Sequence, residues 1–315
     1  MTDALPNPAP YQVLLYYKYV DIADPERFAR EHLALCERLE LRGRVLVASE
    51  GINGTVSGTT ENTNHYIATL HADARFADMQ FKIDPAEDHT FRKIKVKARP
   101  EIVRLSLEDD VDPRQRTGKR LSPQEFYEAM QRDDVVIVDA RNDYEYNVGH
   151  FRGAIRPTVK TFRDFPQWVK ETLAPYRDKT ILTYCTGGIR CEKFSAMLLE
   201  EGFRDVCQLE GGIVTYGKDP QVQGRLFDGS CYVFDERVTV PVNRTEDAVV
   251  ISRCDYCQQP CERYVNCANL DCDHQFLCCV QCEVEHRRSC SPDCENAPWH
   301  EFDPATAGTS KAYYR

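Results

Sequence analysis

Residues 183–190 read TYCTGGIR, and this stretch decides how the central part of the chain is built. An apolar segment leads into Cys185, two glycines follow, and Arg190 opens a segment with helical periodicity. Backbone N–H groups of a glycine turn at a helix N-terminus favour negative charge, because they lie at the positive end of the helix dipole. Such a turn stabilises a thiolate, the reactive form of cysteine. Cys185 is therefore the predicted nucleophile, against the alternative of an unreactive buried cysteine at a strand end.

The segments around this loop predict a doubly wound parallel α/β sheet over residues 122–228. Residues 122–125 form a capping box with proline at the first helical position, which predicts the start of a short helix. The apolar runs 135–140 and 180–184 have the composition of parallel strands that are covered on both faces. The reactive loop then lies at the carboxyl end of a strand, where such sheets bind ligands.

Residues 1–103 predict a separate domain of the ferredoxin-like type, with the element order βαββαβ. This scaffold hosts many functions and by itself indicates none. The polar segment 104–121 is the predicted linker, and residues 229–315 form a cysteine-rich C-terminal region. The expected strands cover 11–20, 44–48, the segment after the turn at 51–54 and the segment with Met79, Phe81 and Ile83, and the expected helices follow Asp24 and cover 60–72.

A basic segment follows the last of these strands. Lys93, Lys95, Lys97 and Arg99 alternate with smaller apolar residues, so an extended backbone places all four cations on one face. The chain as a whole is acidic, with a net charge of -10 and a pI of about 5.4, so a nucleic-acid partner has to bind a local basic patch. These four residues are the predicted contacts to a tRNA backbone, against the alternative of a solvated strand face that binds nothing.

The chain has 15 cysteines, of which ten lie between Cys254 and Cys294. Residues 1–10 show no leader-like pattern and no segment approaches 18 apolar residues, so we expect a cytoplasmic protein in which metal binding is favoured over disulfides. Cys254-x2-Cys257 and Cys279-x2-Cys282 have nearly the spacing of a structural zinc site, and a reduced or partly disulfide-bonded lid is the alternative. Other residues could complete a second site or substitute in the first: Cys261, Cys267, Cys272, Cys278, Cys290, Cys294, His274 and His286.

Residues 139–141 (DAR), 145–146 (EY), 149–154 (GHFRGA) and 185–190 (CTGGIR) resemble the rhodanese family in both halves of the central domain. The resemblance implies a persulfide on Cys185 and a loop held by Arg190. Four residues separate that cysteine from the arginine, one fewer than in related phosphatases, which favours sulfur chemistry over phosphate chemistry. His150 is expected to be structural. The resemblance further implies that the backbone of Thr186, Gly187, Gly188, Ile189 and Arg190 cradles the sulfur, and that Asp139, Arg141 and Glu145 support the loop through buried ion pairs.

The whole chain resembles the family of rhodanese-domain tRNA uridine hydroxylases, through residues 49–55 (SEGINGT), 211–216 (GGIVTY), 229–235 (GSCYVFD) and the Cys254-x2-Cys257 region. The resemblance implies oxygen-dependent conversion of the tRNA wobble uridine to 5-hydroxyuridine, with O2 as co-substrate and tRNA as partner. We find no flavin, haem or nucleotide motif, and expect no membrane contact and no obligate protein partner. Two alternatives stay open: a persulfide sulfurtransferase, with Cys191 as resolving thiol, and a sulfur- or metal-sensing binding module.

Overall fold

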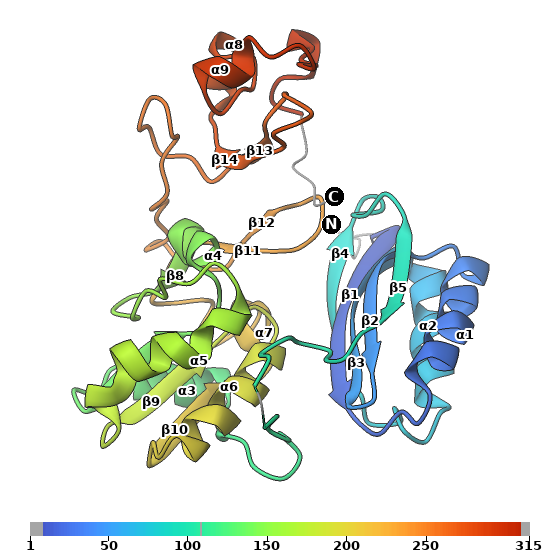
Figure 1. Cartoon of the computed structure of the whole chain (residues 1–315), viewed down its shortest axis with the longest axis vertical. Coiled ribbons are helices and arrows are strands. Elements are labelled where there is room, and N and C mark those ends of the chain that lie inside the picture. Colours follow the sequence, from blue (N-terminus) through green and yellow to red (C-terminus); the bar gives the residue numbers. More distant parts are fainter. Residues whose placement is uncertain (1–8, 108, 310–315) are drawn as a thin grey trace, which may run out of the picture. The chain divides into compact units, whose positions relative to one another are not determined.

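A computed structural model describes residues 9–107 and 109–309. Residues 1–8 lie outside this described part. They belong to the segment 1–10 that shows no leader-like pattern. The chain forms two compact units, Met1–Gln115 and Arg116–Arg315, and the division falls inside the segment 104–121 that was expected to be a linker (Figure 1). No helix in the described residues combines the length and the apolar composition that crossing a membrane requires.

The first unit contains a five-stranded sheet with the order β4-β1-β3-β2-β5, and both of its helices cover one face (Figure 1). The first four strands and the helices have the predicted ferredoxin-like order, and β5 adds a parallel edge strand beside β2. Helix α1 begins after Asp24, whose carboxylate accepts a hydrogen bond from the backbone N–H of Arg27 at 2.9 Å. The elements are β1 (Tyr11–Tyr19), α1 (Pro25–Arg38), β2 (Arg42–Ala48), β3 (Gly51–Thr59), α2 (Thr60–His71), β4 (Phe81–Ala86) and β5 (Ile94–Ala98).

The core of this unit lies between the sheet and the two helices, where Val45 and Val47 of β2 are fully buried beside Tyr66 of α2. The fourth strand begins later than expected, because Met79 precedes β4 although its side chain belongs to this core. Within β4, Ile83 is 40% exposed although its register partner Leu14 is buried. The reason is that β4 forms an edge of the sheet, so alternation along this strand does not guarantee cover by a helix.

The second unit contains the predicted parallel sheet, with the order β6-β10-β9-β7. Strand β6 (Lys119–Leu121) belongs to the segment expected to be linker but pairs with β10, which corrects that boundary. The capping box at Ser122 forms as predicted and starts α3. The other elements of this sheet layer are α3 (Pro123–Ala129), β7 (Val135–Asp139), α4 (Asp143–Val148), α5 (Phe165–Trp168), β9 (Thr180–Tyr184), α6 (Ile189–Glu200), β10 (Asp205–Leu209) and α7 (Gly212–Tyr216).

Two small sheets complete the second unit, one with the order β12-β11-β8 and one that pairs β13 with β14. The second of these lies in the cysteine-rich region, whose regular elements are only three to six residues long. The strands of the two small sheets and the last two helices are β8 (Gly149–Phe151), β11 (Phe227–Tyr232), β12 (Thr239–Pro241), β13 (Tyr264–Asn266), β14 (Gln275–Leu277), α8 (Val280–Glu285) and α9 (Pro292–Glu295).

Candidate active site

Cys185 lies directly after β9 and before α6, at the carboxyl end of the parallel sheet. Gly188 caps α6 with a left-handed backbone (φ 102°), a conformation that costs a glycine little, and its N–H donates a hydrogen bond to Cys185 Sγ at 3.1 Å. The backbone N–H of Cys191 also contacts this sulfur. Within the expected cradle of residues 186–190, Gly188 donates to the sulfur, and Cys191 is a further backbone donor that the sequence did not indicate.

These donors change the ionisation of the cysteine. Burial alone would raise the pKa of Cys185, whose side chain is 1% exposed. A hydrogen bond from the Cys191 thiol, the charge of Arg190 and the N–H groups of Cys191 and Gly188 outweigh burial and lower the pKa to about 5. Burial raises the pKa of Cys191 well above its usual value, so that residue stays protonated and can donate. Cys185 is consequently a thiolate at neutral pH.

Arg190 is held beside the loop by a buried ion pair. Its guanidinium donates to both carboxylate oxygens of Glu145, at 2.6 and 2.8 Å, and Nη2 also donates to Thr186 Oγ1 at 3.2 Å. Burial would lower the pKa of Arg190, but the Glu145 carboxylate more than reverses this and raises it. The paired geometry keeps one positive charge next to Cys185 and fixes the orientation of the loop.

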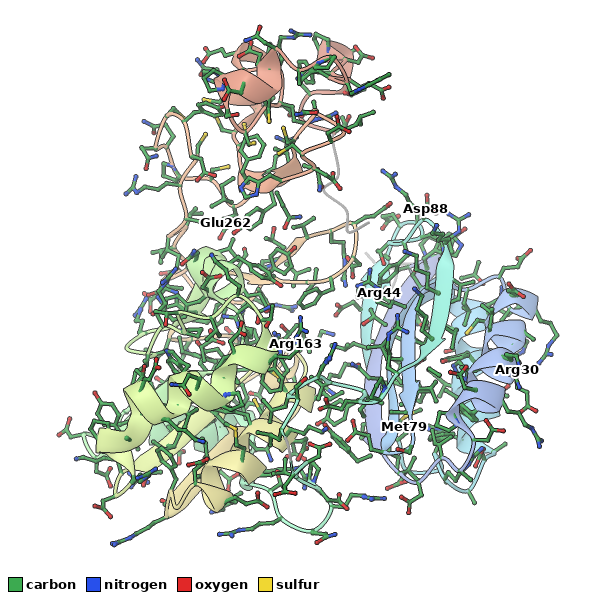
Figure 2. The ribbon with its side chains drawn as sticks, in the orientation of Figure 1. Arg30, Arg44, Met79, Asp88, Arg163 and Glu262 are labelled. Atoms are coloured by element: carbon green, nitrogen blue, oxygen red, sulfur yellow. The ribbon has the colours of Figure 1, made fainter. Side chains whose placement is uncertain are left out.

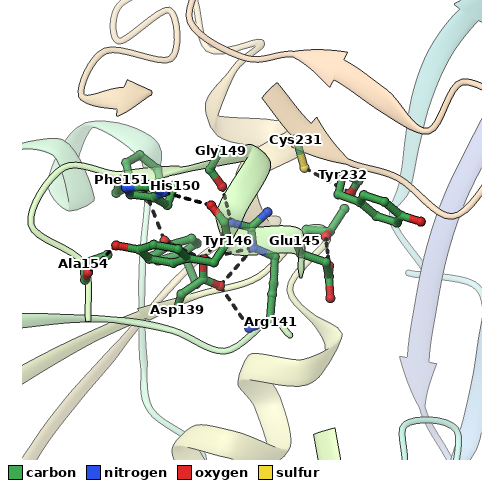
Figure 3. A network of polar contacts seen from close by, with 12 residues as sticks. Asp139, Arg141, Glu145, Tyr146, Gly149, His150, Phe151, Ala154, Cys231 and Tyr232 are labelled. Carbon is green, nitrogen blue, oxygen red and sulfur yellow. Dashed lines mark hydrogen bonds and ion pairs between the residues drawn. The ribbon is translucent and has the colours of Figure 1, made fainter. Parts of the chain in front are cut away.

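A second buried ion pair lies under the loop and is shown in Figure 3. Arg141 and Asp139 are both fully buried and are joined by side-chain hydrogen bonds of 2.9, 3.2 and 2.6 Å. Arg141 Nη2 also donates to the carbonyl oxygen of Gly149 at 2.6 Å, and the Tyr184 hydroxyl donates to Asp139 at 2.7 Å. This pair joins β7, β8 and the end of β9, so it supports the strand end from which Cys185 projects.

The turn before α7 explains why glycines are needed at residues 211–212. A Cβ atom at Gly212, which has a left-handed backbone (φ 71°), would lie 2.7 Å from the carbonyl oxygen of Cys185. The close approach lets the N–H groups of Ile213 and Val214 donate to the carbonyl oxygens of Cys185 and Thr186, at 3.0 and 3.1 Å. These bonds satisfy the outward-facing carbonyls, so the loop can keep its N–H groups directed at the sulfur.

Two further aromatic contacts surround the site. His150 stacks on Tyr146 with ring centroids 3.7 Å apart, and its Nδ1 lies 2.9 Å from the Tyr146 carbonyl oxygen (Figure 3). Phe234 has an exposed ring whose centroid lies 5.8 Å from the Arg190 guanidinium carbon. An aromatic ring at such a place offers a surface on which an unstacked base can lie. Phe234 belongs to the GSCYVFD motif, but the sequence pattern does not indicate that its ring reaches Arg190.

The basic segment lies in the first unit, where β5 pairs with β2. Ile94, Val96 and Ala98 of β5 pack against the core, so Lys95 and Lys97, which alternate with them, lie on the other face. Lys93 and Arg99 flank the strand. Lys95 lies beside Arg44 in this pairing, and Arg44 lies on the sheet face away from the helices (Figure 2). The pKa of Lys95 is lowered, mainly by the charge of Lys93 and further by desolvation and by the charges of Arg44 and Lys97. Lys93, Lys95, Lys97 and Arg44 thus form one positive patch, and Arg44 is a member that the strand pattern alone did not reveal. Arg99 follows the strand and donates to the carbonyl oxygen of Ala98 at 3.1 Å.

The cysteine-rich region brings its sulfur atoms into two groups. Cys254, Cys257, Cys279 and Cys282, the predicted ligand set, have all their sulfur atoms within 4.8 Å of one another. A second group forms by the same measure: Cys267, Cys272, Cys290 and Cys294. All fifteen cysteines are free thiols in this structure.

Comparison with known proteins gives matches over all three regions of the chain. Residues 11–102 match the UPF0176 acylphosphatase like domain, residues 122–219 the rhodanese-like domain, and residues 228–295 the rhodanase C-terminal family. Among solved structures, a rhodanese-like domain protein from Staphylococcus aureus is 23% identical, with a TM-score of 0.27, and covers 32% of this chain and 94% of its own.

Curated relatives match nearly the full length. A tRNA uridine(34) hydroxylase from Bacillus cytotoxicus is 57% identical over 293 residues, which is 93% of this chain and 90% of that protein. A tRNA uridine(34) hydroxylase from Oceanobacillus iheyensis is 59% identical over 288 residues, covering 91% of this chain and 89% of that protein. The family predicted from the motifs is confirmed: the chain belongs to the tRNA uridine(34) hydroxylases.

Proposed function

We propose that this protein is a cytoplasmic tRNA-modifying oxidoreductase that converts the wobble uridine, residue 34 of tRNA, to 5-hydroxyuridine with O2 as co-substrate. The observation that carries this proposal is the identity of 57–59% with proteins named tRNA uridine(34) hydroxylase over about nine-tenths of the chain. The reaction replaces the hydrogen on C5 of the uracil ring by a hydroxyl group. One atom of O2 enters the product, and the other is reduced to water by two electrons and two protons from a cellular reductant.

Cys185 is the proposed nucleophile in this reaction. Its low pKa supports the role, because a thiolate can add to C6 of the uracil ring. The addition forms an S–C6 bond and moves the C5–C6 π electrons toward C5 and O4, which makes C5 the nucleophilic carbon. C5 then bonds to one atom of O2, and two electrons and two protons from the reductant cleave the O–O bond, which leaves a hydroxyl on C5 and releases water. Loss of the C5 proton and departure of the thiolate restore the ring. Arg190 positions the loop and supplies the charge that keeps the sulfur ionised.

The proposed reaction is tested by nucleoside mass spectrometry. In cells that lack this protein and have no second route to the modification, 5-hydroxyuridine and its derivatives should disappear from tRNA, and expression of the wild-type chain should restore them. A matched strain that carries an empty vector is the control. Loss of a thiolated nucleoside instead would indicate sulfur transfer, and unchanged nucleosides would contradict a role in tRNA modification.

We propose that the patch formed by Lys93, Lys95, Lys97 and Arg99 binds the tRNA backbone. The supporting observations are the common face of Lys95 and Lys97 on β5 and the positions of Lys93 and Arg44 close to Lys95. Replacing all four by glutamine should weaken tRNA binding roughly 100-fold and reduce the slope of log K against log salt by about 3, because each lost phosphate contact removes released counterions. Filter binding at several salt concentrations measures both quantities.

A charge-matched pair of variants provides the control for this patch. Lys95→Gln with Lys97→Gln removes two charges from the open sheet face, whereas Arg30→Gln with Arg38→Gln removes two from exposed positions on α1. Only the first pair should change the salt slope. Equal effects of the two pairs would mean that net charge matters and the patch does not.

A further inference from the structure

We infer that the cysteine-rich region is a binuclear zinc module, in which two interleaved sets of four cysteines each hold one structural zinc ion. The first set is the one that the spacing predicts, and the second is Cys267, Cys272, Cys290 and Cys294. Figure 2 shows sulfur atoms gathered around β13, β14 and α8, in the part of the chain that contains both sets. The inference concerns the fold of this region and does not depend on the proposed reaction.

The distances between sulfur atoms fit tetrahedral zinc. A Zn–S bond of about 2.3 Å gives tetrahedral S–S edges of about 3.8 Å. The Cys257 and Cys279 sulfur atoms lie 3.7 Å apart in the first set, and Cys290 lies 3.6 Å from Cys272 and 3.7 Å from Cys294 in the second. A disulfide would need about 2.05 Å. Both sets therefore have the dimensions of a thiolate cage and not of a bonded pair.

Hydrogen-bond donors surround the sulfur atoms of both sets. The N–H of Cys279 points at Cys254 Sγ at 3.5 Å, and the N–H of Cys290 points at Cys267 Sγ at 3.4 Å. The side-chain amide of Asn269 donates to Cys294 Sγ at 3.4 Å. Four thiolates around one Zn²⁺ carry a net charge of −2, and N–H donors of this kind stabilise such charge.

The backbone of this region needs a stabilising element beyond its small apolar core. Its strands and helices are three to six residues long, too short to be stable alone. Gln258, Asp273, Arg287 and Arg288 have left-handed backbones, with φ between 49° and 61°, which non-glycine residues adopt at a cost. Each lies within three residues of a cysteine of one of the sets. Metal bonds to those cysteines would hold these turns in place.

The two sets alternate along the chain. Residues 254–257 and 279–282 supply the first set, and residues 267–272 and 290–294 supply the second, so each site closes a loop that contains half of the other. Glu285 and His286 also lie near Cys282, but its sulfur already belongs to the first set. Cys261 and Cys278 belong to neither set among the described residues. Interleaving means that the whole module folds as one unit.

The module packs on the helix that carries the active-site glutamate. The Tyr264 hydroxyl of β13 donates to the carbonyl oxygen of Tyr144 in α4 at 3.1 Å, one residue before Glu145. The Tyr232 hydroxyl of β11 donates to Gln275 of β14 at 2.7 Å. Buried side chains of both parts share one apolar cluster. Zinc binding would thus stabilise the surface on which α4 packs, and α4 carries Glu145, the partner of Arg190.

Metal analysis of the full chain, purified without chelator, tests this inference. We expect two equivalents of zinc per chain. Cys272→Ser with Cys290→Ser should retain at most one equivalent, and Cys261→Ser, which replaces a cysteine outside both sets, should retain two. A wild-type content of one equivalent or less, or a full content in the double variant, would overturn the second site.

Titration of the wild-type chain with a mercurial thiol reagent tests the same inference when variants fold poorly. Eight thiols should react as two zinc ions are released, which a colorimetric zinc indicator detects, because each site binds its ion through four thiolates. Substitution with Co²⁺ should give the visible absorption of tetrahedral Co²⁺ at both sites, saturating at two equivalents. Release of no zinc, or saturation below two equivalents, would contradict the interleaved arrangement.

Discussion

Replacing Cys185 with serine should lower the 5-hydroxyuridine content of tRNA to the level of cells that lack the protein, a loss of roughly 100-fold or more. A serine hydroxyl is not ionised at neutral pH, so the hydrogen bond from Gly188 and the charge of Arg190 would have no thiolate to stabilise. Nucleoside mass spectrometry of tRNA from complemented cells measures the loss. Full modification by the serine variant would exclude the proposed nucleophile.

Cys207 provides the matched control, because it is also buried at a strand of the same sheet. Burial raises its pKa to about 11, so Cys207→Ser should leave modification unchanged. The two thiols should also differ in alkylation by iodoacetamide followed by peptide mass spectrometry. The rate at Cys185 should reach half its plateau near pH 5 and stay constant through neutral pH. An inflection between pH 8 and 9 would show that the loop does not stabilise the thiolate.

Replacing Glu145 with glutamine should destabilise the second unit by about 3–5 kcal/mol and strongly reduce modification. Glu145 is fully buried and accepts two hydrogen bonds from Arg190, so its neutralisation leaves a buried guanidinium without a counter-charge. Urea unfolding followed by tryptophan fluorescence reports on this unit, because both tryptophans, Trp168 and Trp299, lie in it.

Two variants separate the loss of the ion pair from a general effect of losing a carboxylate. Glu128→Gln changes an exposed residue and should leave the unfolding midpoint unchanged. Glu145→Gln combined with Arg190→Met removes both charges and should recover part of the lost stability without recovering activity, because the charge beside Cys185 is still missing. A Glu145→Gln midpoint equal to that of the wild type would show that the buried pair does not stabilise the loop.

Local signals in the sequence predicted most of the elements and the centre of the site. The caps at Asp24 and Ser122 act over three residues, and the glycines after Cys185 act within one turn, so no distant partner is needed to interpret them. The strand boundaries differ where pairing with distant segments decides them. Met79 alternates with Phe81 and Ile83 but precedes β4, and residues 119–121 of the polar segment form a strand because β10 offers an edge to pair with.

The sequence by itself determined the family, the mixed α/β composition of the two domains and the cysteine proposed as nucleophile, because each of these is encoded by short motifs or by periodicity. Tertiary structure alone decided which groups meet. Glu145 pairs with an arginine 45 residues away, and the Cys191 thiol donates to Cys185. Of the ten clustered cysteines, eight form two sets of four and two belong to neither set. Such choices depend on the packing of segments that are distant along the chain, and neither periodicity nor spacing records that packing.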